Sequence, residues 1–191
     1  MAARLGNVNT LIVDDNAHMI SIVRSMLLGF GISRTHESRD AAEAFDLVRH
    51  ELIDLIIVDY QMPLLDGLEF IRMVRTGADM KNPFVPIILL TAHTERSRII
   101  AARDAGVTEI CAKPVTAKQM WEKIVAVVNS PRPFVKTANY FGPDRRRKNE
   151  EYKGPERRSV VTERINEDGP VIQDDGGADD DAGDSAEQAA I

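Results

Sequence analysis

The sequence predicts an α/β domain with a doubly wound, five-stranded parallel sheet. Over the first 130 residues, short apolar runs alternate with segments whose apolar side chains recur at helical spacing. The apolar runs are nearly continuous, as expected of parallel strands buried on both faces. Each run is followed by a helical segment, which places helices on both sides of the sheet.

The first strand, at 10–13, is a short apolar run rich in β-branched residues. The helix that follows, at 17–30, has apolar residues at helical spacing and glycines near its end. A short strand fits 34–38. Asp40 then suits the N-cap of a helix that extends to residue 50.

The second half of the domain repeats this alternation. An apolar strand at 55–58 precedes a helix at 67–76, and a third apolar strand at 85–90 precedes a helix at 95–105 that Gly106 closes. The last strand and helix are expected at 109–112 and 116–129.

Polar side chains gather where the predicted strands end. Asp14 and Asp15 follow the first strand, Asp59 follows the strand at 55–58, and Thr91 and Lys113 follow later strands. In such sheets the chemistry collects at the carboxyl ends of the strands. Three carboxylates suit Mg²⁺, and a carboxylate beside such an ion can accept a phosphoryl group. A nearby lysine and a threonine hydroxyl can stabilise the phosphoryl oxygens.

Residues 8–128 resemble a response-regulator receiver domain of the CheY-like type, with its flavodoxin-like fold. The resemblance implies that Asp59 accepts phosphate from a histidine kinase or phosphotransfer protein. It also implies that Thr91 and Lys113 bind the phosphoryl oxygens. The matching motifs are Asp14-Asp15, Asp59-Tyr60-Gln61-Met62-Pro63 leading to Asp66-Gly67, Thr91-Ala92 and Lys113-Pro114.

The same resemblance implies a Mg²⁺ site. Its ligands would be Asp15, Asp59 and the backbone carbonyl of Gln61, with Asp14 acting directly or through water. The peptide bond between Lys113 and Pro114 is expected to be cis. The paired aspartates could instead be strand-end caps and Lys113 a surface charge, but four matching sites at four strand ends favour the phosphorylation site.

One position departs from the family pattern. Three residues before Lys113, the family usually has an aromatic side chain that turns inward when the threonine engages phosphate, and here that residue is Ile110. An isoleucine cannot make the same rotation or expose the same ring, although Thr91 itself could still move. Gln61 and His93 match positions that tune the phosphoryl lifetime in the family.

Charge divides the chain into parts. Residues 1–139 carry no net charge, residues 140–165 carry +3, and residues 166–191 carry −9. We therefore expect a receiver domain at 1–129, a linker at 130–139, an irregular arginine-rich arm at 140–165 and a disordered acidic tail at 166–191.

The expected arm contains the sequence Gly-Pro-acid-Arg-Arg twice, at 142–146 and 154–158. Arginine matches phosphate oxygens and the guanine edge through paired hydrogen bonds, and it stacks on bases. Tyr140 and Tyr152 precede the two copies at the same offset. A ligand with two guanines and two phosphates, such as cyclic di-GMP, suits this repeat. The candidate ligand-binding residues are Tyr140, Asp144, Arg145, Arg146, Arg147, Tyr152, Glu156, Arg157 and Arg158.

The arm is similar, over roughly residues 132–159, to the arginine-rich C-terminal extensions of the CheY-like cyclic di-GMP effectors called the Cle group. That similarity implies a role near the flagellar motor or surface-attachment machinery. The arm lacks the Asp/Asn-x-Ser-x-x-Gly pattern of PilZ proteins. Nonspecific contact with anionic surfaces, or a plain linker, remain alternative interpretations of the arm.

Two functions fit the sequence. The first is a signalling adaptor, not an enzyme, that combines phosphorylation on Asp59 with cyclic di-GMP binding. The second is a phosphorelay or chemotaxis receiver whose arm tethers it to a partner. DNA binding is disfavoured, because the acidic tail repels long polyanions and no helix-turn-helix pattern follows residue 130. Without a signal peptide or a membrane-spanning apolar run, we expect a cytoplasmic protein.

Overall fold

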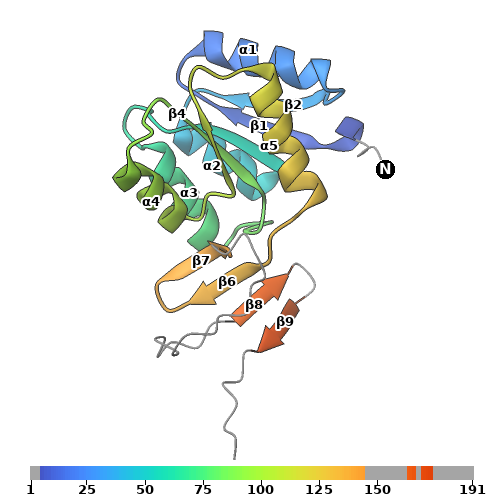
Figure 1. The fold of residues 1–191 in the computed structure, drawn as a ribbon. Helices are drawn as coiled ribbons and strands as arrows, with labels where there is room; N and C mark the ends of the chain where they lie inside the picture. The colour runs from blue at the N-terminus through green and yellow to red at the C-terminus, as the bar shows by residue number, and fades with distance from the viewer. Residues whose placement is uncertain (1–4, 145–162, 167–168, 174–191) are drawn as a thin grey trace, which may run out of the picture.

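The computed structural model describes residues 5–144, 163–166 and 169–173 (Figure 1). A short 3₁₀ turn, Leu5–Asn7, precedes the first strand. The strands of the main sheet are β1 (Asn9–Val13), β2 (Arg34–Ser38), β3 (Leu55–Asp59), β4 (Ile87–Thr91) and β5 (Glu109–Ala112). The helices are α1 (Ala17–Gly29), α2 (Ala41–His50), α3 (Gly67–Thr76), α4 (Arg96–Ala105) and α5 (Ala117–Asn129).

The five strands are all parallel and lie in the order β2-β1-β3-β4-β5. This confirms the doubly wound, flavodoxin-like fold that the sequence predicts. Helices α1 and α5 cover one face of the sheet, and α2, α3 and α4 cover the other (Figure 1). Each face has its own aliphatic core, because successive strand residues point to opposite sides.

Capping side chains mark where α2, α3 and α5 begin. Asp40 accepts hydrogen bonds from two backbone N–H groups at the start of α2, as the sequence predicts. Asp66 and Thr116 form capping boxes, each with a partner three residues on, at the starts of α3 and α5. Gly106 ends α4 at a φ of 97°, a left-handed conformation that favours glycine. These helix termini fix the loops that join the helices to the ends of the strands.

The C-terminal part differs from the expectation of a linker and an irregular arm. It contains a second, antiparallel sheet in the order β7-β6-β8-β9, next to the ends of α3 and α5 in Figure 1. Its strands are β6 (Phe134–Thr137), β7 (Tyr140–Pro143), β8 (Glu163–Asn166) and β9 (Gly169–Gln173).

These strands correct three of the expected segments. The linker at 130–139 contains β6, the arm at 140–165 begins with β7, and β9 lies within the expected disordered tail. None of these four strands is a continuous apolar run, and β7 and β9 contain glycine and proline, which are depleted in strands, so the sequence did not indicate them.

The hairpin of β6 and β7 packs against the receiver through three phenylalanines. Phe84, in the loop before β4, lies 5.1 Å from Phe134 and 5.2 Å from Phe141 between ring centres. The rings of Phe134 and Phe141 are 5.5 Å apart. The hairpin therefore contacts the amino end of the parallel sheet, away from the strand ends that carry the aspartates.

Candidate functional site

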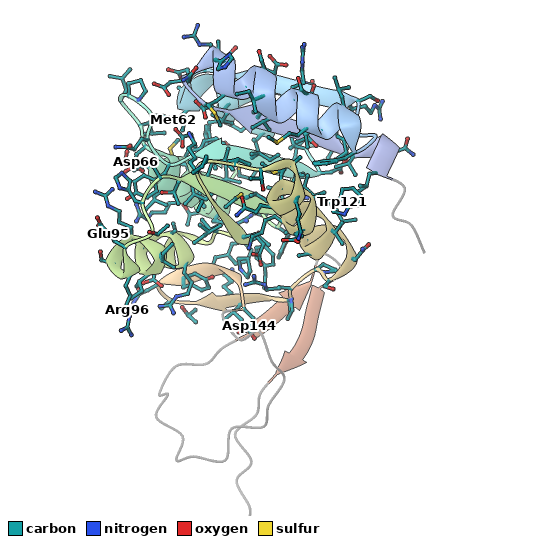
Figure 2. The ribbon with its side chains drawn as sticks, turned by 45° about the horizontal axis from the view of Figure 1, so that its top comes forward. Met62, Asp66, Glu95, Arg96, Trp121 and Asp144 are labelled. Atoms are coloured by element: carbon teal, nitrogen blue, oxygen red, sulfur yellow. The ribbon has the colours of Figure 1, made fainter. Side chains whose placement is uncertain are left out.

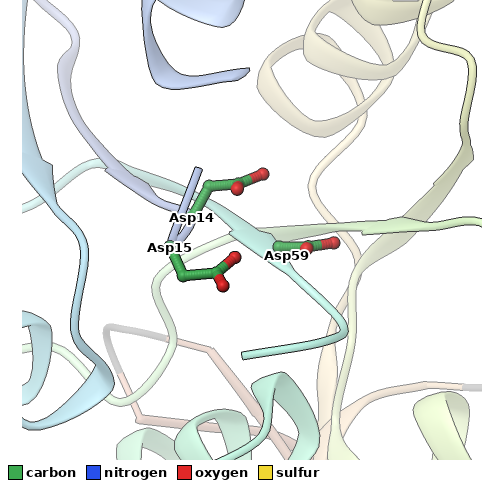
Figure 3. Close-up of side chains that lie close together, drawn as sticks. All are labelled: Asp14, Asp15 and Asp59. Atoms are coloured by element: carbon green, nitrogen blue, oxygen red, sulfur yellow. The ribbon is translucent and has the colours of Figure 1, made fainter. Parts of the chain in front are cut away.

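The aspartates predicted from the sequence meet at the carboxyl ends of two neighbouring strands. Asp14 and Asp15 follow β1, and Asp59 is the last residue of β3. Carboxylate oxygens of the three residues lie within 4.8 Å of one another (Figure 3). Asp14 and Asp59 are buried, and Asp15 is more exposed. This set of hard oxygen donors fits Mg²⁺.

Lys113 joins two of these carboxylates. Its Nζ lies 2.9 Å from Oδ1 of Asp59 and 3.3 Å from Oδ2 of Asp14. The lysine follows β5, and its backbone N–H donates to the carbonyl of Thr91, 2.8 Å away. The ammonium group thus extends from the end of the edge strand β5, past β4, to the aspartates at the ends of β1 and β3. It partly neutralises the negative charge of the three carboxylates.

Burial and the ion pairs act in opposite directions on the pKa values of this cluster. Burial raises the pKa of the Asp59 carboxyl above its usual value, although Lys113 beside it opposes that rise. Burial alone would lower the pKa of Lys113. Its hydrogen bond and charge interaction with Asp59, together with Asp14, outweigh that effect and raise the lysine pKa.

Thr91 ends β4 beside the aspartates and is almost fully buried. Its hydroxyl accepts a hydrogen bond from the backbone N–H of His93 at 3.0 Å and is 3.3 Å from the His93 carbonyl. The hydroxyl is thus held by the loop that leads to α4. A phosphoryl group on Asp59 would compete with that loop for the threonine.

The loop after Asp59 carries the remaining predicted ligand. Gln61 lies two residues after Asp59, and its carbonyl as a Mg²⁺ ligand stays a prediction. The loop is closed by a hydrogen bond from the backbone N–H of Gly67 to the carbonyl of Tyr60, 3.0 Å away. The peptide bond between Lys113 and Pro114 is cis, as the family resemblance implied.

The sequence indicated no role for two side chains near the loop after Thr91: Tyr60, which contacts His93 of that loop, and Arg98, which contacts Tyr60. The ring of Tyr60 meets the ring of His93 edge to face at 5.9 Å, and the guanidinium of Arg98 lies 5.5 Å from the Tyr60 ring centre. Tyr60 adjoins Asp59 in the motif, which is a sequence signal for it. Arg98 comes from α4, and its place here depends on the fold alone.

Of the candidate ligand-binding residues, Tyr140 and Asp144 lie within the described part of the chain. Tyr140 donates its hydroxyl to the carbonyl of Pro143, 2.8 Å away, and the Asp144 N–H donates to the carbonyl of Pro133. Both residues therefore belong to the docked hairpin. The remaining candidates lie outside the described residues: Arg145, Arg146, Arg147, Tyr152, Glu156, Arg157 and Arg158.

Known proteins resemble the larger part of the chain. Residues 10–125 match the family model of the response regulator receiver domain. The chemotaxis protein CheY-3 of Vibrio cholerae is 32% identical over 118 residues, 62% of this chain and 89% of that protein. The chemotaxis protein CheY of Pseudomonas aeruginosa is 35% identical over 114 residues, 60% of this chain and 90% of that protein.

Solved structures of receiver-type proteins share the fold of this chain. CheY4 of Vibrio cholerae superposes with a TM-score of 0.58 at 28% identity, covering 63% of this chain and 98% of that one. The receiver domain of the sensor histidine kinase PA1611 from Pseudomonas aeruginosa, described with a magnesium ion in its active site cleft, gives 0.58 at 27% identity, covering 64% and 98%. Among the described residues, no helix has the length and apolar character needed to cross a membrane.

Proposed function

Because the chain belongs to the response regulator receiver domain family, we propose that it is a signalling adaptor with two inputs. Phosphorylation on Asp59 is the first input, and binding of cyclic di-GMP to the C-terminal arm is the second. Receiver domains are generally non-enzymatic modules that interact with histidine kinases or phosphotransfer proteins in two-component signalling. The proposed setting is control of the flagellar motor, chemotaxis or surface attachment.

One observation supports phosphorylation on Asp59 as the first input. Nζ of Lys113 lies 2.9 Å from Oδ1 of Asp59, and two further aspartates lie beside them. Receiver domains bind Mg²⁺ at an acidic site of this kind. When bound, the ion would supply charge neutralisation for phosphoryl transfer. Asp14, Asp15 and Asp59 would hold it, with the Gln61 carbonyl as a further ligand. Lys113 and Thr91 would then bind the phosphoryl oxygens.

The second input is supported by the arginine repeat and by where it starts. The first copy begins at Gly142, at the end of a hairpin that packs on the receiver. The arm therefore leaves from a fixed place on the domain, and the arginines that follow have the chemistry that recognises guanine and phosphate.

A small phosphodonor tests the first input. The full chain, incubated with acetyl phosphate and Mg²⁺, should gain one phosphoryl group by mass spectrometry. The Asp59→Asn variant should gain none, because it lacks the nucleophilic carboxylate. Labelling of the variant to the wild-type level would refute Asp59 as the acceptor.

Calorimetry tests the second input. Cyclic di-GMP is titrated into the full chain and into a double variant, Arg146→Ala with Arg158→Ala. We expect binding to the wild type and a large loss of affinity in the variant. Repeating the titration with beryllofluoride and Mg²⁺ then measures whether the two inputs are coupled.

The similarity to chemotaxis proteins supports a second candidate function. In it, the chain is a phosphorelay or chemotaxis receiver that does not bind nucleotide, and the arm tethers it to a partner. Phosphorylation of Asp59 without any heat from cyclic di-GMP in the wild type would favour this candidate over the adaptor.

A further inference from the structure

A groove runs along the edge strand β5, between α4 and the end of β7, with a volume of about 340 Å³. Its apolar lining includes Ile99 from α4, Val107 from the turn before β5, and Ile110 from β5 itself. Pro143, the second residue of the first arginine repeat, lines the groove at the hairpin end. The receiver and the C-terminal hairpin therefore build this groove together.

Two guanidinium groups line the same groove. Arg103, from the last turn of α4, pairs with its neighbour Asp104 at 3.3 Å, and both side chains are about half exposed. An exposed pair of this kind is worth little, so an incoming anion can replace the aspartate at low cost. Arg132 is held by the carbonyl of Thr108, 2.8 Å away, and its side chain is 21% exposed.

The buried carboxylate of the groove is already neutralised. Glu109 forms ion pairs with Lys123, at 2.8 Å, and with Arg132. Two cations on one carboxylate leave the surrounding surface without net negative charge. The groove thus offers an apolar lining and guanidinium groups, a combination that suits a base joined to a phosphate.

The hairpin end of the groove is firmly fixed to the receiver. A Cβ atom on Gly142 would lie 2.9 Å from the Cα of Gly106, so the two backbones touch where α4 ends. The Asp144 N–H bonds the Pro133 carbonyl at 2.8 Å. Figure 2 places Asp144 at the hairpin, beyond α4 and far from Met62 and Asp66 in the loop after Asp59. The arginine repeat therefore starts at the edge of the groove.

From this arrangement we infer that the groove is a second contact region for the dinucleotide, on the receiver itself. The inference rests on the proposed binding of cyclic di-GMP to the arm and adds Arg103 and Arg132 to its ligand contacts. A volume of about 340 Å³ lies at the small end of ligand sites, so the groove takes one guanine nucleotide half. The other half remains for the arm. Thr91 lines the opposite end of the groove, which brings the ligand close to the phosphorylation site.

Calorimetry with cyclic di-GMP on the full chain tests the groove. Arg103→Ala should weaken binding about tenfold, the effect of losing a charge-assisted hydrogen bond. Ile110→Glu, which places a carboxylate in the groove against the ligand's phosphates, should weaken it at least as much. The matched control is Arg49→Ala, because Arg49 is also a helical arginine paired with an aspartate at 3.2 Å but lies on α2. Its affinity should equal that of the wild type.

The outcomes separate the groove from the arm. If Arg103→Ala and Ile110→Glu both kept wild-type affinity while the Arg146→Ala and Arg158→Ala double variant lost binding, the groove would be refuted as a contact region and the arm would stand as the binding site. No binding by the wild type would refute the proposed function and the groove with it. Thermal unfolding of each variant, compared with the wild type, distinguishes a loss of binding from a loss of folding.

Discussion

The guanidinium carbon of Arg75 lies 5.0 Å from the centre of the Phe134 ring, which joins α3 of the receiver to β6 of the hairpin. Arg75 is 3% exposed, and it donates from Nε to the Gly106 carbonyl and from Nη1 to the Pro83 carbonyl, at 3.0 and 2.6 Å. Burial lowers the pKa of Arg75 to about 9, so the side chain stays protonated at neutral pH. A buried cation thus ties three receiver segments to the first strand of the C-terminal sheet.

Phe134→Ala should detach this hairpin. Losing a buried phenylalanine ring costs about 3 kcal/mol of the free energy of unfolding, measured by urea denaturation. It also leaves the guanidinium of Arg75 without its aromatic neighbour, so we expect faster trypsin cleavage at the exposed Lys136 in β6, mapped by mass spectrometry. The control is Phe30→Ala, because Phe30 stacks on Trp121 at 5.2 Å on the α1 and α5 side. Equal protection of Lys136 in both variants would contradict the docked hairpin.

Gly67→Ala should damage the proposed phosphorylation site. A Cβ atom at this position would lie 2.1 Å from the backbone oxygen of Asp59, closer than any real contact. Either α3 or the end of β3 must shift, so we expect a loss of about 3 kcal/mol in stability and slower labelling of Asp59 by acetyl phosphate.

The matched control for that change is Gly29→Ala at the end of α1. Nothing lies within 4 Å of a Cβ atom there. Alanine loses less chain entropy than glycine in a helix, so stability should rise by up to about 1 kcal/mol. If Gly67→Ala changed the free energy of unfolding no more than Gly29→Ala, the close contact between α3 and the Asp59 backbone would be refuted.

The site was predictable because its residues follow apolar strands. Asp14, Asp59, Thr91 and Lys113 each occur at or just after a run of strand residues, and a parallel sheet brings such ends to one edge. The aspartates and Lys113 meet there as the pattern indicates. The roles of Lys113 in phosphoryl binding and of Gln61 as a ligand came from family resemblance and stay predictions.

The docked hairpin was not predictable in the same way. Phe84, Phe134 and Phe141 are far apart in sequence or on strands of four residues, so no periodic pattern links them. Arg75 occupies an ordinary helical position in the sequence, and only the fold places its guanidinium against a ring. Contacts that depend on tertiary packing alone leave no local signal.

Leu64→Asn should stabilise the protein. Leu64 adopts a left-handed conformation with a φ of 69°, and it is 99% exposed, so the leucine contributes no burial that would offset the strain. Asparagine visits this conformation more readily, and the free energy of unfolding should rise by about 1 kcal/mol in urea denaturation. Leu52→Asn is the control, since Leu52 is 67% exposed and has no positive φ; it should change stability by less than about 0.5 kcal/mol. A Leu64→Asn variant no more stable than the control would argue against strain at this position.

Lys113→Met should increase the affinity for Mg²⁺. In the wild type, the ammonium group lies against Asp59 and Asp14 and offsets part of the charge that attracts a divalent cation. Without the ammonium group, three carboxylates with oxygens within 4.8 Å of one another have no lysine beside them. The interaction energy between two unit charges at this distance is several kcal/mol at most.

After allowing for solvent screening, we expect the Mg²⁺ dissociation constant of Lys113→Met to fall about tenfold in calorimetric titration. Labelling by acetyl phosphate should fall at the same time if Lys113 binds the phosphoryl oxygens as proposed. Lys118→Met, on the exposed surface of α5, controls for the loss of a positive charge and should leave both measurements unchanged. Weaker Mg²⁺ binding in Lys113→Met would mean that the lysine orients the aspartates more than it competes with the ion for them.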